Sequence, residues 1–478
     1  MEHLVTLGVA VGFLCVLCSL FMRWNELRHW RRGLPPGTMG WPVVGETIEF
    51  LRRGPDFMKK QRARYGSLFT SHLLGSPTVV STDLEVNRWI LMNEGKGLVP
   101  GYPRAMAVIL GEGNVSAVHG PVHRVVRGAL MSVIGPAAVR DRLFPTLDEF
   151  IGSRLHSWGG GGATLDVQEK AREMLLSSTL KLISGTETGE TAAELKAEFF
   201  TLLRGTLSLP VNLPGTAYRR GLQARKRITS LLRDLIEERR SPSAPKGGGD
   251  ILSFLLREEE RQEEQEVHRT RPKLTDDQTI DLLVTIMYTG FEAVSSTVTM
   301  VVKYLHDHPS ALQELRNEYS EIGRRKSSPD EALTWEDYTS MSFTRAVILE
   351  TMRLATIVNG VMRKTTKDIP INGFVIPKGW RILVYVRESN YDSLRYPMSL
   401  CFDPWRWKDR SLENHPYFMA FGCGGRLCLG KELAMVETSL FLYYFLTRYR
   451  WEETGGDEIV LFPRVEAPRG LHIRLWTN

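Results

Sequence analysis

The sequence predicts a mainly α-helical protein with a small β region, and three observations support this fold class. Long stretches of the chain place apolar residues three or four positions apart, which is the period of a helix with one buried face. Strand-like patterns are confined to short runs such as residues 66–83, where two short strands are separated at Gly75 and Ser76. Of the 478 residues, 42% are hydrophobic and 24% are charged, which fits a globular chain with a large core and excludes a disordered or fibrous one.

The uncharged N-terminal segment, residues 4–22, is predicted to cross a membrane as a helix. At ~1.5 Å per residue it nearly matches a hydrocarbon layer of ~30 Å. Glu2 and His3 precede the segment and several arginines follow it, which favours an uncleaved anchor with its C-terminal side in the cytosol. A secreted precursor is the alternative interpretation.

The anchor sets the expected domain boundaries. Residues 1–22 are the predicted transmembrane anchor, residues 23–44 a basic, proline-rich linker, and residues 45–478 the folded domain. Two adjacent prolines, Pro35 and Pro36, predict an extended connector that stands off from the core.

Charge and cysteine content narrow the possible functions. The formal net charge of +6 is spread along the chain, without the basic stripe and interleaved aromatics that nucleic-acid binding requires, so we expect no nucleic-acid partner. Cys15 and Cys18 lie in the N-terminal segment, which leaves Cys401, Cys423 and Cys428 in the folded domain. Three cysteines do not form a disulfide framework, and a reducing compartment fits.

A helix of about thirty residues is predicted between Thr275 and Pro309. Thr275 and Gln278 form a capping-box signature, and the apolar pattern then continues until the proline ends it. The middle of this helix holds Gly290, which costs ~1 kcal/mol relative to alanine, and Glu292, a carboxylate in an apolar stretch. The glycine indicates either a functional site or close packing against a neighbour.

A second predicted helix, residues 341–356, carries Glu350 and Arg353 on one face. Downstream, Arg406 follows Pro404 between aromatic residues, a setting typical of a partly buried guanidinium that needs a carboxylate. Glu350 is the candidate partner. The alternative for Glu350 and Arg353 is an ordinary surface ion pair.

The glycine-rich stretch at residues 418–435, "FMAFGCGGRLCLGKELAM", points to metal chemistry. Cys428 precedes a helical pattern, so its sulfur should lie at a helix N-terminus, where the thiolate is favoured. A thiolate can be a metal ligand or a nucleophile. No histidine base is near in the sequence and Cys423 is five residues away, which disfavours nucleophilic catalysis and zinc. A single thiolate suits haem iron, and Arg426 can pair with a haem propionate.

These motifs resemble those of the cytochrome P450 monooxygenases. The family's haem-binding signature, FxxGxRxCxG, is filled at every position by Phe421, Gly424, Arg426, Cys428 and Gly430. Glu350 and Arg353 resemble the family's ExxR pair, and Arg406 resembles the arginine that completes that triad. The resemblance implies the cytochrome P450 fold, a haem b cofactor with Cys428 as the iron ligand, and electrons from NADPH through NADPH–cytochrome P450 reductase.

The resemblance assigns further cofactor contacts. His123 and Arg127 occupy the places of the family's propionate-binding helix, and Arg363 is expected to be a third propionate partner.

The long helix resembles the family's oxygen-activating segment at Thr289, Gly290 and Glu292. The family usually has a threonine after the acidic residue, and its hydroxyl holds the water that delivers a proton during oxygen activation. This chain has Ala293 at that position. We expect Thr289 to replace the missing hydroxyl in part.

Within the family, several segments resemble the brassinosteroid-6-oxidases of plants, among them "YGSLFTSHLLGSPTVV", "INGFVIPKGWRI" and "RVEAPRGLHIR". This implies a steroid substrate and oxidation at C-6 of a 6-deoxo brassinosteroid, such as 6-deoxocastasterone, to an alcohol and then a ketone, with a lactone in some members. The alternatives are hydroxylation elsewhere on brassinosteroids or related sterols, or a sterol-binding haem protein whose oxygen activation is weak because of Ala293.

The resemblance also implies a place in the cell and a pocket. A monomer with residues 45–478 as a cytosolic haem-thiolate monooxygenase domain, held by one span in the endoplasmic reticulum membrane, is expected. The expected pocket walls are residues 108–118, 286–293, 357–361 and 466–471.

Overall fold

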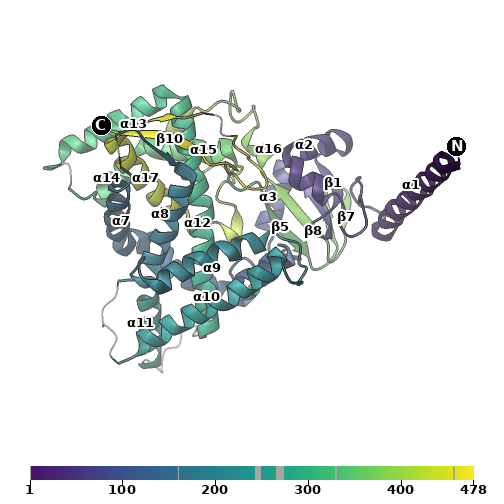
Figure 1. Ribbon diagram of the computed structural model, residues 1–478, viewed down its shortest axis with the longest axis horizontal. Helices are drawn as coiled ribbons and strands as arrows, with labels where there is room; N and C mark the ends of the chain where they lie inside the picture. Colours follow the sequence, from purple (N-terminus) through teal and green to yellow (C-terminus); the bar gives the residue numbers. More distant parts are fainter. Residues whose placement is uncertain (1, 160, 243–248, 265–273, 329–330, 456–457) are drawn as a thin grey trace. The chain divides into compact units, whose positions relative to one another are not determined.

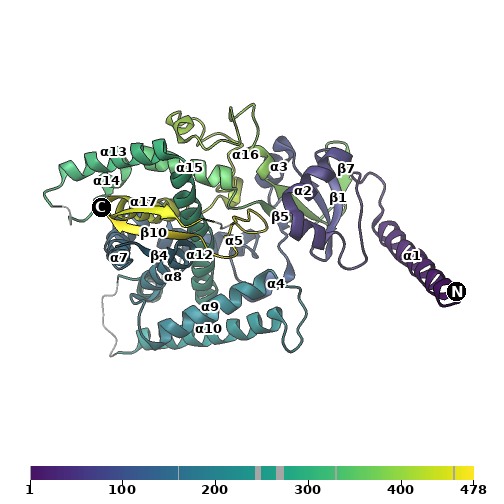
Figure 2. The same cartoon turned by 45° about the horizontal axis from the view of Figure 1, so that its top comes forward.

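The computed structural model describes residues 2–159, 161–242, 249–264, 274–328, 331–455 and 458–478 (Figures 1 and 2). The chain divides into two compact units, each assembled from separate stretches of sequence. Unit 1 comprises Met1–Tyr102, Asn359–Ser389 and Cys423–Arg426. Unit 2 comprises Pro103–Val358, Asn390–Gly422 and Leu427–Asn478.

Unit 1 contains most of the β-structure. Its five-stranded sheet has the order β1-β2-β8-β5-β3, and β6 and β7 form a separate pair. All neighbouring strands are antiparallel except β2 and β8. The strands of this unit are β1 (Leu68–Leu73), β2 (Ser76–Ser81), β3 (Leu98–Pro100), β5 (Gly360–Thr365), β6 (Ile369–Ile371), β7 (Phe374–Ile376) and β8 (Arg381–Tyr385). Its helices are α1 (Glu2–His29), α2 (Thr47–Tyr65), α3 (Leu84–Met92) and η3 (Gly424–Arg426), and α16 (Arg387–Asn390) begins in it.

The β1–β2 hairpin confirms the two short strands predicted from the sequence. Its turn is made by Leu74 and Gly75, which have φ angles of 53° and 73°. Two successive positive φ angles match the twist of the flanking strands, which fixes the register.

Unit 2 is predominantly helical and confirms the predicted mainly α fold class. Its helices are α4 (Arg104–Leu110), α5 (Gly120–Ile134), α6 (Pro136–Ala138), η1 (Val139–Leu143), α7 (Phe144–His156), α8 (Val167–Ser184), α9 (Glu190–Thr206), α10 (Ala217–Arg240), α11 (Ile251–Glu264), α12 (Asp276–Asp307), α13 (Pro309–Arg325), α14 (Trp335–Ser340), α15 (Ser342–Ala355), η2 (Pro404–Lys408) and α17 (Lys431–Arg448). A three-stranded antiparallel sheet has the order β4-β10-β9, with β4 (Ala163–Asp166), β9 (Tyr449–Glu453) and β10 (His472–Thr477).

The 32-residue helix α12 is the central element of unit 2. The predicted capping box is confirmed: the Gln278 amide donates to Thr275 Oγ1 at 3.3 Å, and the Thr275 amide donates to Gln278 Oε1 at 2.9 Å. α12 packs against α8, α15 and α17. By length and composition α12 could cross a membrane, but 67% of that window is buried inside the protein. We therefore interpret α12 as a core helix.

The N-terminal helix α1 is longer than the uncharged segment, because it runs from Glu2 to His29. It therefore includes the first residues of the expected linker. Near its end, Asn25 is 2% exposed and its side-chain amide donates to the carbonyls of Met39 and Gly40 at 3.0 and 3.1 Å. The end of α1 is thus joined to the connector that follows it.

The prediction that this connector stands off from the core is wrong. The Thr70 amide on β1 donates to the Pro36 carbonyl at 2.8 Å, and Met39 is 5% exposed. Glu46 is partly buried and accepts hydrogen bonds from Thr38 at 2.7 Å and Ser71 at 2.6 Å. A proline pair fixes an extended backbone but does not prevent that backbone from pairing with a sheet edge, which is what the connector does.

Candidate functional site

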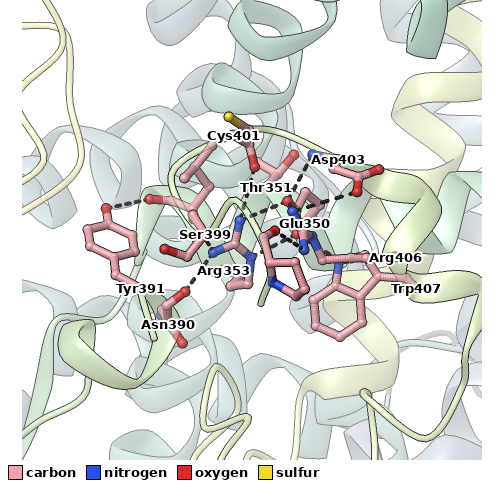
Figure 3. Close-up of polar contacts among 12 residues, drawn as sticks. Glu350, Thr351, Arg353, Asn390, Tyr391, Ser399, Cys401, Asp403, Arg406 and Trp407 are labelled. Carbon is pink, nitrogen blue, oxygen red and sulfur yellow. Dashed lines mark hydrogen bonds and ion pairs between the residues drawn. The ribbon is translucent and has the colours of Figure 1, made fainter. Parts of the chain in front are cut away.

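The Glu350–Arg353 pair lies in the core of unit 2, and both side chains are 0% exposed (Figure 3). Arg353 Nε donates to Glu350 Oε2 and Arg353 Nη2 donates to Glu350 Oε1, each at 2.8 Å. This two-point geometry fixes the carboxylate relative to the guanidinium. The alternative of an ordinary surface ion pair is therefore wrong.

Arg353 uses its full donor capacity. Its Nη1 donates to the carbonyls of Asn390 and Ser399 at 2.6 and 2.7 Å, and its Nη2 also donates to the Cys401 carbonyl at 3.3 Å (Figure 3). Together with the two bonds to Glu350, these contacts account for the five N–H groups of a guanidinium. Arg353 therefore ties α15 to the long loop between α16 and η2.

Glu350 joins the same helix to η2. Its carboxylate also accepts from Arg406 Nε at 3.1 Å, from the Trp407 indole at 2.8 Å and from the Asp403 amide at 2.9 Å. The predicted pairing of Arg406 with Glu350 is confirmed. Sequence reasoning missed Trp407, because an indole N–H gives no charge signal in a sequence.

Cys428 lies in the loop before α17, and its side chain is exposed. The loop is held by the Cys428 amide, which donates to the carbonyl of the buried Phe421 at 2.9 Å. Gly430 is the residue before the first turn of α17. The structure thus confirms that Cys428 precedes a helix.

The electrostatics of Cys428 differ from the prediction. Although part of the side chain is accessible, burial by the surrounding protein raises the pKa of its thiol. The Gly430 N–H and the charges of Arg127 and Lys431 lower the pKa but do not outweigh burial. The helix terminus therefore favours the thiolate, as expected, but burial outweighs its effect, and a bound metal ion would hold the sulfur deprotonated.

His123 and Arg127 lie one turn apart on α5. His123 is 9% exposed, and Arg127 Nη2 donates to the Leu427 carbonyl at 2.9 Å. Leu427 is next to Cys428 in the chain. The structure therefore brings α5 against the cysteine loop within unit 2. The role of His123 and Arg127 as propionate partners stays a prediction.

Arg363 and Arg426 both approach Glu94 within unit 1. Arg426 Nε pairs closely with Glu94 Oε1, and Arg363 Nη2 lies 3.5 Å from Glu94 Oε2. Burial lowers the pKa of Arg363, and Tyr102, which is hydrogen-bonded to it, partly opposes that effect. Sequence reasoning missed Glu94, which no motif marks.

One face of α12 is open in the middle of an otherwise buried helix. Thr289 is exposed there, and Gly290, Glu292 and Ala293 are partly exposed. A Cβ added to Gly290 would meet only Thr179 Oγ1, at 3.6 Å. Close helix packing therefore does not account for the glycine, and the interpretation as a functional site is favoured.

The hydroxyls near Ala293 all donate to backbone carbonyls. Thr289 donates to Thr285 at 2.8 Å, Thr297 donates to Ala293 at 2.8 Å, and Ser296 donates to Val465 at 2.9 Å. Of the three residues, only Thr289 is exposed. Its oxygen can therefore accept a hydrogen bond from water but has already used its proton.

One of the expected pocket walls, residues 108–118, lies against α12. From this wall, the Gly113 amide donates to Asp281 Oδ2 at 2.8 Å and Asn114 donates to Thr285 Oγ1 at 2.7 Å. From the C-terminal segment, Arg464 Nε lies 3.2 Å from Glu292 Oε1. Sequence reasoning missed Arg464, although its neighbours were expected to line the pocket.

The residues present fit a haem group. Backbone carbons at Gly425 and Gly430 each have open space where a Cβ would be, and Arg363 Nε is a buried donor without a partner in the described parts of the chain. The propionate carboxylates of a haem would accept a hydrogen bond from Arg363, and glycines without side chains would let the flat haem approach the loop. Among the described residues, the one cluster of three potential metal ligands is His306, Asp307 and Glu453, which does not include Cys428. A lone thiolate is the donor set of haem iron.

Comparisons with known proteins agree with these observations. The family model described as Cytochrome P450 matches residues 35–466. The chain is 56% identical to "Cytochrome P450 85A1" of Solanum lycopersicum over 462 residues, with 97% of each chain covered. It is 53% identical to "Cytochrome P450 85A1" of Oryza sativa subsp. japonica over 475 residues, with 99% of each covered. The solved structure of "Retinoic acid bound cyanobacterial CYP120A1" has a TM-score of 0.82 and 26% identity, and the match covers 93% of this chain and 99% of that one.

Proposed function

The chain belongs to the cytochrome P450 family, and from that membership we propose that it oxidises C-6 of 6-deoxo brassinosteroids. It is a monooxygenase that acts on a small molecule, contains haem iron and takes electrons from a reductase. The single observation that carries the substrate proposal is the similarity to Cytochrome P450 85A proteins along nearly the whole chain. The segments that resemble brassinosteroid-6-oxidases agree with it.

The proposed reaction consists of two oxygen insertions at one carbon. Thiolate-bound haem iron supplies the activation of dioxygen, and NADPH supplies the electrons through the reductase. The first insertion gives the C-6 alcohol. A second insertion gives a geminal diol, which loses water and leaves the ketone.

The proposed cofactor site assigns a role to each residue of the haem-binding signature and its supports. Cys428 is the iron ligand, and Phe421, Gly424 and Gly430 shape its loop. A Cβ on Gly424 would lie 2.7 Å from the Leu91 carbonyl oxygen, and its φ angle is 68°, so only glycine fits this position. The residues proposed to hold the propionates are His123, Arg127, Arg363 and Arg426.

The proposed proton-delivery residues lie on the open face of α12. Glu292 supplies a carboxylate, Thr289 accepts a hydrogen bond from an ordered water, and Gly290 and Ala293 leave room for that water and for the steroid. The remaining work of the protein is to orient a rigid apolar substrate and to exclude bulk water.

A second candidate function is a sterol-binding haem protein with weak oxygen activation. The observation that favours it is the use of all three neighbouring hydroxyl protons by backbone carbonyls, which leaves none to donate at Ala293.

Turnover of the full chain with its reductase, NADPH and 6-deoxocastasterone tests these functions, with products identified by mass spectrometry. The proposed function predicts the C-6 alcohol followed by the ketone, and no product from Cys428→Ser. A hydroxyl at another carbon, with C-6 unchanged, would instead support a different brassinosteroid hydroxylase. NADPH consumption without a steroid product would support the second candidate.

We further propose that α1 is a single membrane span in the endoplasmic reticulum and that residues 45–478 act in the cytosol as a monomer. At the end of α1, Trp24, Leu27 and Trp30 are 51%, 67% and 67% exposed, and aromatic residues are favoured at membrane–water interfaces. In unit 2, the α9–α10 loop exposes four aliphatic side chains: Leu207, Leu209, Val211 and Leu213. An exposed apolar loop of this kind is typical of a membrane-contacting surface.

A further inference from the structure

We propose that Arg464 is the positioning residue for Glu292, and that it makes proton delivery depend on the C-terminal segment, residues 459–471. This inference rests on the proposed function, because it concerns the carboxylate that we place in the proton-delivery pathway.

The Glu292 carboxylate has one ion-pair partner among the described residues, which is Arg464. The two side chains are 23% and 25% exposed, and Arg464 Nε lies 3.2 Å from Glu292 Oε1. The carboxylate accepts no hydrogen bond from the described parts of the chain. Arg464 alone therefore restrains Glu292, and the second carboxylate oxygen remains able to accept a proton from water or donate one to it.

Arg464 is itself fixed by a contact to another helix. Its Nη2 donates to Thr206 Oγ1 at 3.2 Å, and Thr206, the last residue of α9, is 1% exposed. Thr206 donates its own proton to the Leu203 carbonyl at 2.7 Å, so its oxygen is oriented to accept from Arg464. The guanidinium is thus held at two different nitrogens by groups from two different helices, which favours a single orientation.

The backbone next to Arg464 is also fixed, by hydrogen bonds from α12 and α8. The Ser296 hydroxyl on α12 donates to the Val465 carbonyl at 2.9 Å. Gln168 on α8 donates to the Ala467 carbonyl and accepts from the Ala467 amide, both at 2.8 Å. The contacts with α8 and α12 therefore fix the position of the backbone from which Arg464 reaches Glu292.

A general acid must hold its carboxylate at hydrogen-bond distance from the proton it transfers, and such catalysis contributes ~10²–10⁴-fold. This chain has no hydroxyl at Ala293, where the family usually has a threonine. Proton delivery should therefore depend more on the Glu292 carboxylate and on its orientation. An anchored oxygen and a free oxygen on the same carboxylate suit this task.

The test compares Arg464→Gln with Arg464→Lys and with the matched control Arg172→Gln. Arg172 pairs with Glu466 at 3.4 Å, so the control loosens the same segment without touching Glu292. Arg464→Gln should lower product formed per NADPH ~10-fold and raise the solvent isotope effect on product formation. The substrate-induced spectral shift should keep its dissociation constant, Arg464→Lys should restore coupling in part, and Arg172→Gln should leave it unchanged.

A double variant tests whether Arg464 acts through Glu292. Adding Arg464→Gln to Glu292→Gln should cause no further loss, because Arg464 then has no carboxylate to position. Full additivity, unchanged coupling in Arg464→Gln, or an equal loss in Arg172→Gln would each overturn the proposal.

Amide hydrogen exchange gives a readout that does not depend on turnover. Because hydrogen bonds from α8 and α12 hold the segment, Glu292→Gln and Arg464→Gln should leave exchange in residues 459–467 unchanged. Faster exchange there would overturn the proposal, because it would show that the variants act by loosening the segment. The identity of the native product tests the proposed C-6 oxidation separately, since a different product would leave the variant comparisons intact.

Discussion

Ala293 is the residue at which this chain departs from the proton-delivery pattern that the resemblance implies, and we propose Thr289 as the substitute. Thr289 is exposed on the open face of α12, but its proton is donated to the Thr285 carbonyl. Its oxygen can still accept from water. A hydroxyl that can only accept a hydrogen bond from water should order that water less well than a hydroxyl that can also donate one.

If Thr289 helps to deliver the proton, substitutions at Thr289 and Ala293 should change the amount of product formed per NADPH consumed. Ala293→Thr should raise product per NADPH, and Thr289→Ala should lower it, because general acid assistance is worth ~10²–10⁴-fold and partial loss appears as peroxide. Both ratios are measured against the native protein. If neither substitution changes the ratio, proton delivery follows another route.

Glu437 is a buried acid whose ionisation should affect stability. It is 2% exposed on α17 and accepts one hydrogen bond, from Ser178 at 3.2 Å. Burial raises the pKa of Glu437 from 4.5 to about 8. Between these values the folded protein keeps a proton that the unfolded chain releases, so stability should fall as the pH rises through that range, by up to about 5 kcal/mol.

Glu437→Gln should flatten this pH dependence, because an amide has no proton to lose. The unfolding midpoint of the native protein is compared with that of the variant from acid to mildly alkaline pH. Glu452→Gln, at an exposed position of β9, serves as the control. A native protein whose midpoint does not fall between pH 4.5 and about 8 would contradict the assignment.

Residue-level prediction succeeded where the local sequence marks both partners and failed where it marks at most one of them. The Glu350–Arg353 pair is three residues apart and could be predicted from helix geometry. Glu94 and Arg426 are 332 residues apart, and nothing in the local pattern of either one identifies the other. Arg464 was missed for the same reason.

At the scale of elements, the Glu350 network joins α15 to η2 and to the loop before it. Glu350→Ala leaves two buried guanidiniums without their carboxylate, and breaking a buried ion pair by removing one partner costs ~3–5 kcal/mol. We expect aggregated protein without haem, measured by haem content and size-exclusion chromatography. The exposed Glu336 on α14 provides the control, since Glu336→Ala should change stability little.

A different outcome would reject the structural role of this network. Glu350→Ala protein that folds with full haem content and only reacts slowly would mean that Glu350 acts in catalysis and not in assembly.

Element boundaries followed from local signals where a cap or a breaker is present. The capping box and Pro309 fixed α12 almost to the residue. The helix predicted after Cys428 begins at Lys431, with Gly430 at its N-cap. The connector was misassigned because its burial depends on Glu46 and β1, which are tertiary contacts that proline composition does not encode.

At the scale of the whole molecule, the mainly α fold class was predictable from periodicity, whereas the composition of the two units was not. Unit 1 takes Cys423–Arg426, and the chain returns to unit 2 at Leu427. One short motif therefore supplies residues to both units. A linear pattern cannot show this, because it depends on which distant strands and helices each stretch meets.

Membrane attachment is predicted to have two parts. If α1 spans the bilayer as we propose, the full chain should stay with membranes in alkaline carbonate. Deleting residues 4–22 should make it extractable by carbonate while leaving weak binding to vesicles, which Leu209→Asp with Leu213→Asp should abolish. A truncated protein that still resists carbonate would contradict α1 as the span.

The central claim is that Cys428 alone provides the thiolate for haem iron, and the carbon-monoxide difference spectrum of the reduced protein tests it most directly. Cys423 lies in the same loop, with its sulfur 3.5 Å from Met92 Sδ, and is the matched control. We predict that Cys428→Ser loses the long-wavelength band of thiolate-bound haem and that Cys423→Ser keeps it. Loss of the band in Cys423→Ser, with the band retained in Cys428→Ser, would contradict the account.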